Sequence, residues 1–260
     1  MPRYARFTLI GKHRWGTVVD DPSHPGEWLQ PLVGSPWDGG TPAPAGEPLA
    51  MDTLRLDVPT TPTKIVCVGR NYVEHAKELG HEVPTEPLIF LKPPSSLLAH
   101  EGAIVYPRGK TELVHHEGEL AIVIGRTTKD VSEADAPAHI FGYSVLNDVT
   151  ARDLQRKDVQ FTRGKGFDTF CPIGPWVDTD FVPAAQRLVV EVDGEVRQSS
   201  TLDLMIFKIP FLVSWISRHM TLERGDVIAT GTPAGVGPLV PGNVVTVSIE
   251  GLGTLRNTVV

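Results

Sequence analysis

The sequence contains little of what marks several common protein classes. Cysteine occurs only twice, as Cys67 and Cys171, and these positions lack the spacing of a metal motif, so we expect buried free thiols. No apolar run has the length of a signal-peptide core or of a membrane span. The net charge is −7 and the lysines and arginines are dispersed, which argues against a nucleic-acid partner. We therefore expect a cytoplasmic protein with neither a membrane nor a nucleic acid as its partner.

The length and the proline and glycine content define the expected domains. A chain of 260 residues that is 41% hydrophobic can form one medium domain and a small appendage. Residues 1–60 predict a small N-terminal β-rich domain with a linker, because Tyr4–Ile10 and Trp15–Val19 are typical of paired strands. The stretch 22–48 is rich in proline and glycine and predicts mostly loop. Residues 61–260 are expected to form the main domain.

Short strands dominate the expected main domain. The dipeptide Asp193-Gly194 is the strongest hairpin signal in the sequence, and Ile209–Met220 is the clearest apolar helix. No internal repeat is visible. These features predict an α+β fold that is mainly β. The clearest strands are expected at Lys64–Val68, Leu120–Gly125, Phe141–Leu146, Leu188–Val192, Asp226–Thr230 and Val244–Ile249.

Three acidic residues carry the chemistry of the sequence. Side chains on a strand repeat every second residue, so a strand that begins before Leu120 places Glu117 and Glu119 on one face. Their carboxylates would lie about 6–7 Å apart, and at an effective dielectric of about 20 they would repel by roughly 2–3 kcal/mol. A second apolar strand delivers Asp148 at its end. Beside apolar strands, these charges need a cation or a shared proton.

The ligand set decides which cation is expected. Carboxylates without cysteine or well-spaced histidines suit a hard ion, namely Mg²⁺, Mn²⁺ or Ca²⁺. His115 and His116, which precede Glu117, are expected to support the strand rather than to bind the ion. A solvated pair of glutamates at the mouth of a strand would produce the same pattern.

A short helix is expected between Gly69 and Gly80, with Asn71 as its cap and Gly80 at its end. His75 and Glu78 are three residues apart and share one face of it. A carboxylate that orients an imidazole can make the imidazole a general base. An exposed helix rich in charge is the alternative.

A glycine-rich loop follows the strand Asp226–Thr230. Its glycines allow backbone amides to approach an anion closely, and Thr232 offers a hydroxyl. The loop lacks the closing Gly-Lys-Ser/Thr of a Walker A motif and the spacing of a dinucleotide fingerprint. A carboxylate cradle and a plain tight turn fit the pattern equally well.

Four motifs in order and in register resemble those of the fumarylacetoacetate hydrolase family. They cover about residues 62–260 and are Val68-Gly69-Arg70-Asn71-Tyr72 with His75 and Glu78, His115-His116-Glu117-Gly118-Glu119, Asn147-Asp148-Val149-Thr150-Ala151-Arg152-Asp153, and Gly231-Thr232-Pro233 with Gly235-Val236-Gly237. The resemblance implies the family's mixed β-sandwich roll, a small variable N-terminal domain and a homodimer. It also implies a mobile lid from Asn71 to about Glu86 that orders over the substrate.

The resemblance assigns roles to individual residues. Glu117, Glu119 and Asp148 match the ligands of a divalent ion, usually Mg²⁺; His75 and Glu78 match the pair that activates water; Gln155 and Lys165 match contacts to substrate oxygens; Thr232 matches the threonine that binds the substrate carboxylate; and Arg70 lies where an anion would bind. One departure matters. Val68 stands where the larger enzyme of tyrosine catabolism has a fourth acidic ligand, so the same substrate is not implied.

The implied substrate is a small oxo or dioxo acid, and three reactions fit it. Hydrolysis of a C–C bond in an acylpyruvate-like acid ranks first, because both His75 and Glu78 are present. Decarboxylation of an oxaloacetate-like acid and isomerisation of a 2-hydroxyhepta-2,4-diene-1,7-dioate-like acid are the alternatives, since each needs the same stabilised enolate. From other classes, a non-catalytic small-acid-binding protein and a nucleotide-binding glycine loop stay open.

Overall fold

The computed structural model describes residues 2–19, 26–37, 42–80 and 82–260. Its strands are β1 (Arg3–Leu9), β2 (Lys12–Val19), β3 (Trp28–Pro31), β4 (Leu49–Ala50), β5 (Arg55–Asp57), β6 (Ile65–Gly69), β7 (Leu88–Lys92), β8 (Leu97–Leu98), β9 (Ala103–Ile104), β10 (Val114–His116), β11 (Gly118–Ile124), β12 (Ile140–Asn147), β13 (Thr150–Ala151), β14 (Cys171–Asp178), β15 (Arg187–Val192), β16 (Glu195–Thr201), β17 (Val227–Ala229), β18 (Gly237–Leu239), β19 (Val244–Ile249) and β20 (Gly253–Val259). The α-helices are α1 (Val73–Glu78), α2 (Arg152–Lys157), α3 (Thr162–Lys165) and α4 (Ile209–His219), and 3₁₀ turns lie at Met51–Thr53, Pro94–Ser96, Ala136–His139 and Leu202–Leu204.

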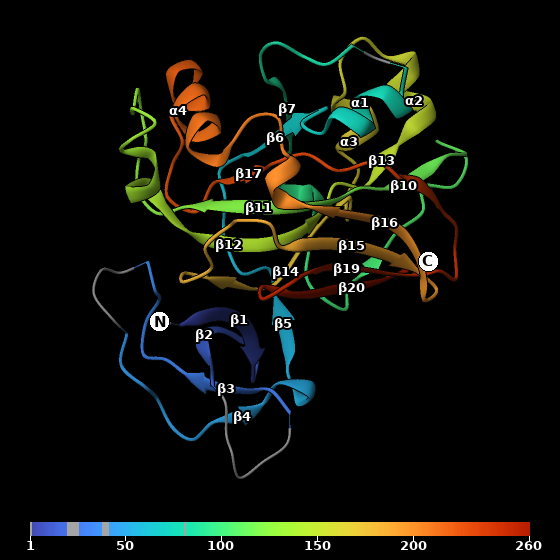
Figure 1. The fold of residues 1–260 in the computed structure, drawn as a ribbon. Coiled ribbons are helices and arrows are strands. Elements are labelled where there is room, and N and C mark those ends of the chain that lie inside the picture. Colours follow the sequence, from blue (N-terminus) through green and yellow to red (C-terminus); the bar gives the residue numbers. More distant parts are fainter. Residues whose placement is uncertain (1, 20–25, 38–41, 81) are drawn as a thin grey trace.

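The described strands form a mainly β fold of three sheets (Figure 1). The largest sheet runs in the order β4-β3-β2-β1-β14-β12-β11-β17-β6-β7, with β5 added to β1 and β8 to β14. A second sheet has the order β16-β15-β19-β20-β9, and a small third sheet has the order β13-β10-β18. The predicted fold class is confirmed, and the family's sandwich arrangement is visible in the two stacked large sheets.

The core lies between the two large sheets. Every residue of β11 is buried, and alternate residues of β15 and β19 are buried against it. This follows from the side-chain period of two on half-buried strands, whereas a strand covered on both faces is apolar throughout. Helix α4 packs its apolar face, including Leu212, Val213 and Ile216, onto the same core. The core thus fixes the strand ends at which the acidic residues lie.

The N-terminal strands extend the main sheet. Strand β1 pairs antiparallel with β14 through Arg3–Asp178 and Tyr4–Val177, so the sheet continues from one part of the chain into the other. The predicted hairpin is confirmed, although its turn is shorter than expected. Ile10 and Gly11 both have positive φ, and β2 already begins at Lys12. The described part of residues 22–48 is mostly loop, as predicted, and contains one short strand, β3, which pairs with β2; residues 20–25 and 38–41 lie outside the described part.

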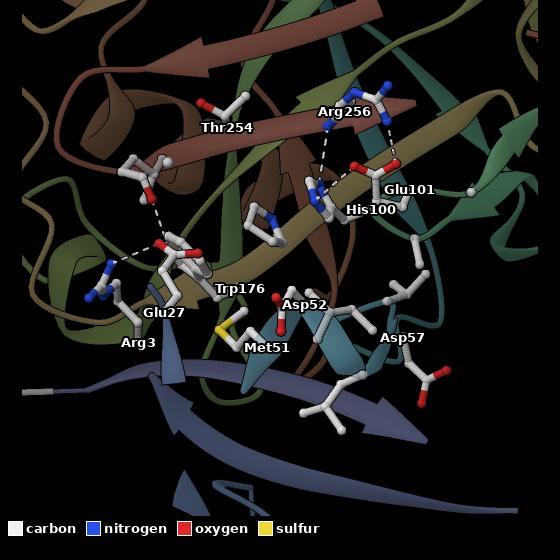
Figure 2. Close-up of a pocket in the computed structure, with 18 of the residues that line it drawn as sticks. Arg3, Glu27, Met51, Asp52, Asp57, His100, Glu101, Trp176, Thr254 and Arg256 are labelled. Atoms are coloured by element: carbon white, nitrogen blue, oxygen red, sulfur yellow. Dashed lines mark hydrogen bonds and ion pairs between the residues drawn. The ribbon is translucent and has the colours of Figure 1, made fainter. Parts of the chain in front are cut away.

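A wide cleft of about 1520 Å³ lies where the N-terminal strands meet the main domain (Figure 2). Its lining includes Arg3, Met51, His100, Trp176 and Arg256. Figure 1 shows that helices α1, α2 and α3 gather at the other end of the molecule, away from the N-terminal strands. In the described part of the chain, no helix is long and apolar enough to cross a membrane.

Candidate active site

The three predicted carboxylates converge. Strand β11 pairs antiparallel with β12 so that Gly118 faces Asn147, which brings the start of one strand beside the end of the other. Glu119 lies in β11, Glu117 lies just before it, and Asp148 follows β12. The amide of Asp148 donates to the carbonyl of Glu117 at 2.8 Å. Each residue offers one carboxylate oxygen within 4.8 Å of the others, and all three are buried, which excludes the solvated pair of glutamates.

Three buried cations surround these carboxylates. Lys165 Nζ donates to Glu117 Oε2 at 2.8 Å and to Asp148 Oδ2 at 2.7 Å. Lys92 Nζ donates to Asp148 Oδ1 at 2.6 Å, and Arg152 Nη2 donates to Glu117 Oε1. Removing charges from water is costly unless they are paired and hydrogen-bonded, and this network pairs them. The Lys165 ammonium bridges Glu117 and Asp148, so these two carboxylates can hold one cation between them.

The electrostatics of the site differ between its two glutamates. Burial alone would raise the pKa of Glu117, but the charges of Lys165 and Arg152 lower this pKa far below its usual range. Burial raises the pKa of Glu119 well above its ordinary value, and the charges of Asp148 and Glu117 raise it further. No lysine or arginine in the described part of the chain forms an ion pair with Glu119. Glu119 is therefore the carboxylate that most lacks a cation.

The glycine-rich loop holds the carboxylates of the protein itself. The amide of Gly231 donates to Glu119 Oε2 at 2.7 Å. Gly231 has a φ of +99°, and an added Cβ would lie 2.7 Å from the Cβ of Asn71, so only glycine fits there. The amide of Gly235 donates to Glu78 Oε1 at 2.9 Å. Two of the amides expected to cradle an anion are thus occupied by Glu119 and Glu78, which leaves them closed to a nucleotide.

The histidine–glutamate pair of α1 is formed. His75 Nδ1 and Glu78 Oε2 are 3.0 Å apart, and the other oxygen of Glu78 reaches Gly235. His75 is only 4% exposed and lines the pocket, so the alternative of a purely exposed charged helix is excluded at this position. Helix α1 therefore packs over the pocket and is held there by Glu78. The predicted motion of the lid stays a prediction.

Asn71 does not cap this helix, contrary to the prediction. The residue before the helix is Tyr72, which is extended and makes no capping bond with its side chain. Asn71 instead donates to the carbonyl of Thr230 at 2.7 Å and accepts from the amide of Phe207 at 2.7 Å. Tertiary contacts with the glycine-rich loop thus replace the local cap. Gly80, with a φ of +72°, ends the helix as predicted.

The carboxylates line a pocket of about 270 Å³. Its lining contains all the predicted catalytic and substrate-binding residues except Glu78: Arg70, His75, Gln155, Lys165 and Thr232. Gln155 accepts from Arg152 Nη1 at 2.5 Å, and the Thr232 hydroxyl donates to the carbonyl of Gly118 at 2.9 Å. The roles of these residues toward a substrate stay predictions. Phe90 lies at the wall, with Lys165 Nζ 4.8 Å from its ring centre.

The two histidines before Glu117 are not part of the acidic cluster, as expected. His116 Nδ1 lies 3.1 Å from the side-chain oxygen of Gln198. Burial, followed by the charge of Arg152, lowers the pKa of His115 to about 4, so His115 is neutral near pH 7. Both histidines lie in strand β10, and their role in supporting it stays a prediction.

Sequence reasoning missed two of the three cations. Arg152 lies within the motif of Asp148, four residues after it, but the sequence analysis assigns it no role. Lys92 ends the apolar run of β7 and precedes two prolines. The available signal was a charged residue at the end of an apolar run, a position that Lys92 shares with Asp148. The two cysteines are buried and free, as expected.

Comparison with family models places two matches along the chain. The C-terminal domain of fumarylacetoacetate hydrolase matches residues 64–260, and an N-terminal domain described as Rv2993c-like matches residues 3–59. The three carboxylates, the pair on α1 and the glycine-rich loop all lie within the first match.

Three proteins that are similar to this chain have names that state an activity. A crystal structure of 2-hydroxyhepta-2,4-diene-1,7-dioate isomerase from Mycobacterium marinum is 43% identical, covers 100% of this chain and 98% of its own, and has a TM-score of 0.90. A mitochondrial oxaloacetate tautomerase of Arabidopsis thaliana, FAHD1, is 50% identical over 75% of this chain and 89% of its own length. A fumarylpyruvate hydrolase from Pseudomonas aeruginosa, solved with Mn²⁺ and pyruvate, is 37% identical over 77% of this chain and 91% of its own, with a TM-score of 0.73.

Proposed function

Because the chain belongs to the fumarylacetoacetate hydrolase family, we propose that it is a divalent-metal-dependent enzyme that interconverts the enol and keto forms of a small 2-oxo acid of the oxaloacetate type. The observation that carries this proposal is the buried His75, paired with the more exposed Glu78, in the lining of a small pocket that also contains the three carboxylates. This reverses the order predicted from the sequence, in which C–C hydrolysis came first. Relatives with isomerase and tautomerase names support the reversal.

The residues fit a hard divalent ion. Glu117, Glu119 and Asp148 would hold it, because three buried carboxylate oxygens within 4.8 Å of one another are the donor set that Mg²⁺ and Mn²⁺ prefer. A relative in this family was solved with Mn²⁺. When bound, the ion supplies a Lewis acid that draws electron density from the 2-oxo group of the substrate.

Cationic side chains orient the substrate and stabilise its negative charge. Lys165 and Arg152 both line the pocket and are almost fully buried, so their hydrogen bonds act in a medium of low dielectric. Each can donate to an oxygen that becomes more negative as the enol forms. Arg70, at the pocket wall, is placed to bind the distal carboxylate of a dicarboxylic acid.

His75 carries the proton that defines the reaction. Its Nδ1 is held by Glu78, so Nε2 is the atom that exchanges a proton with C3 of the substrate. In the direction from enol to keto, the enol hydroxyl releases one proton and C3 gains one, so no water is consumed and no C–C bond breaks. Glu78 fixes the ring, and its second bond to Gly235 fixes α1.

The size of the pocket favours a short acid. About 270 Å³ lies just below the roughly 300–1,000 Å³ typical of ligand sites. Hydrolysis of an acylpyruvate would require space for the acyl group and an attacking water as well. It is nevertheless the second candidate, because an imidazole oriented by Glu78 can also activate water and a fumarylpyruvate hydrolase is among the relatives.

One assay on one preparation separates the reactions. The enzyme is supplied with Mg²⁺ or Mn²⁺ and three products are followed: keto-oxaloacetate from the enol form, CO₂ from oxaloacetate, and pyruvate from acylpyruvates. We expect the enol form to be consumed with the highest kcat/KM. Faster cleavage of an acylpyruvate would instead assign hydrolysis, and faster release of CO₂ would assign decarboxylation. Ion binding without turnover of any 2-oxo acid would leave a non-catalytic small-acid-binding protein.

A further inference from the structure

Lys92 contacts the candidate metal ligand Asp148 from outside the pocket. It is the last residue of β7, and its side chain is fully buried. Its ammonium donates to Asp148 Oδ1 at 2.6 Å and to the carbonyl of Val149 at 3.0 Å. Lys92 does not line the pocket, and both hydrogen bonds of its ammonium go to the protein. Any effect it has on the reaction must pass through Asp148 or through its charge.

The formal charges of the buried network show how much net charge a bound divalent ion would leave. Glu117, Glu119 and Asp148 contribute three negative charges, and Lys92, Arg152 and Lys165 contribute three positive ones. A divalent ion bound by the ionised carboxylates therefore leaves a buried net charge of about +2, which is costly in a medium of low dielectric. A doubly negative ligand offsets more of this charge than a singly negative ligand does, and Arg70 and Arg156, which also line the pocket, favour the dianion further. Lys92 is the cation that contributes to this sum without contacting the ligand.

Building on the proposed function, we propose that Lys92 is a positioning and charge-setting residue that makes the candidate site bind its divalent ion tightly only together with a doubly negative ligand. The free enzyme then holds the ion weakly. Binding of a dianion and of the ion reinforce each other, because coupling between two ligands is reciprocal. Lys92 thereby selects dianionic over monoanionic acids, although it lies outside the pocket.

A merely structural role for Lys92 predicts the opposite sign. If Lys92 only oriented Asp148, its loss would weaken ion binding by about 10–100-fold, as for other residues that support metal ligands. Loss of its charge instead strengthens binding of the ion alone, because one repulsive charge disappears. The two roles can therefore be separated by measuring ion affinity rather than activity.

The test measures Mn²⁺ affinity by electron paramagnetic resonance or calorimetry, with the free ion corrected for complexes in solution. Lys92→Met is compared with the wild-type enzyme, each alone, with oxalate as the dianion and with pyruvate as the monoanion. We expect Lys92→Met to bind Mn²⁺ alone about tenfold more tightly or better. The extra affinity that oxalate confers beyond pyruvate should fall by about tenfold. Weaker Mn²⁺ binding with an unchanged difference between oxalate and pyruvate would overturn the proposal.

Matched variants control for folding and for the loss of an ion pair. Lys64→Met breaks another lysine–aspartate pair, with Asp226 at 2.5 Å, away from the pocket, and should change neither Mn²⁺ affinity nor its dependence on oxalate. Lys92→Gln removes the charge but keeps a donor, and should behave like Lys92→Met. Should neither Lys92 variant fold, the wild-type enzyme decides. Oxalate must then raise Mn²⁺ affinity more than pyruvate does, and equal effects would refute the proposal. Absence of Mn²⁺ binding to the wild-type enzyme even with oxalate would overturn the proposed function itself.

Discussion

Two hollows in the described part of the molecule differ in size and in the burial of the charged residues that line them. The cleft beside the N-terminal strands measures about 1520 Å³, and its Glu101 and Arg256 are 52% and 41% exposed (Figure 2). The pocket beneath α1 measures about 270 Å³, and its carboxylates are between 1% and 4% exposed. The smaller hollow thus carries the perturbed charges. Burial and convergence of ionisable groups, rather than volume, mark the candidate active site.

This difference has an energetic consequence. An exposed ion pair such as that of Glu101 with Arg256 is screened by water and contributes about 0–1 kcal/mol. Buried charges such as Glu117 and Lys165 depend on one another, because each would be costly without its partner. The same chemical change, a carboxylate replaced by an amide, should therefore have very different effects in the two regions.

The largest effect is expected at the candidate metal ligands. Glu119→Gln removes the carboxylate that has no lysine or arginine partner, so the fold should be retained. Turnover should fall by about 10⁴-fold or more, because the Lewis acid is worth several kcal/mol in the transition state. Steady-state assays with increasing Mn²⁺ check this. Turnover that is preserved, or that needs no metal, would remove Glu119 from the ion site.

A smaller but still large effect is expected at the base. His75→Ala should reduce enol–keto conversion by about 10²–10⁴-fold while leaving Mn²⁺ affinity little changed. Decarboxylation, which needs no proton at C3 before CO₂ leaves, should survive to a greater extent. Measuring both rates on one preparation gives the comparison. If the variant converts the enol as fast as the wild-type enzyme, His75 is not the base.

An intermediate effect is expected on stability as a function of pH. Because burial raises the folded-state pKa of Glu119, its contribution to the stability of the metal-free protein is complete at low pH and is lost as pH rises through the raised value. Relative to Glu119→Gln, the free energy of unfolding of the metal-free wild-type protein should fall by up to about 1.4 kcal/mol per pH unit as the pH rises from the ordinary pKa of a glutamate to the raised pKa of Glu119. Denaturant titrations with a chelator, from about pH 5 to about pH 8, measure this difference. Parallel curves for the two proteins would contradict the assignment.

The smallest effect is expected in the cleft. Glu101→Gln makes the same carboxylate-to-amide change as Glu119→Gln but breaks only an exposed pair with Arg256. The free energy of unfolding should change by no more than about 1 kcal/mol, and kcat/KM should not change. A clear loss of activity in this variant would show that the cleft, and not only the pocket beneath α1, takes part in the function.

The part of the site that follows from local pattern was predictable from the sequence. Glu117 and Glu119 stand two residues apart at the start of an apolar run, Asp148 follows another such run, and His75 and Glu78 share a helix face, so each could be found within a few residues. Lys92 could not be placed in this way. It reaches Asp148 from β7, which lies several strands away in the sheet order, and no local spacing encodes that approach.

Errors in the predicted fold have the same origin. Asn71 has the chemistry of a helix cap, but its amide satisfies Thr230 and Phe207 instead, because these contacts hold the glycine-rich loop in place. Strand β3 lies in a stretch rich in proline and glycine, and its pairing with β2 and β4 makes it a strand. Tertiary partners decided both cases, and a single sequence does not show them. Homodimer formation stays a prediction.

In the proposed reaction His75 moves a proton at C3 of a small 2-oxo acid, and Glu117, Glu119 and Asp148 hold the divalent ion that the reaction needs. Proton NMR in D₂O tests it most directly, by following the enol form of oxaloacetate and the deuterium that enters C3. We expect the wild-type enzyme with Mg²⁺ to accelerate both processes together, and His75→Ala and Glu119→Gln to lose both. Two results would contradict this role of His75 and of the ion. One is that the wild-type enzyme with Mg²⁺ accelerates neither process, and the other is that His75→Ala and Glu119→Gln accelerate both as much as the wild-type enzyme does.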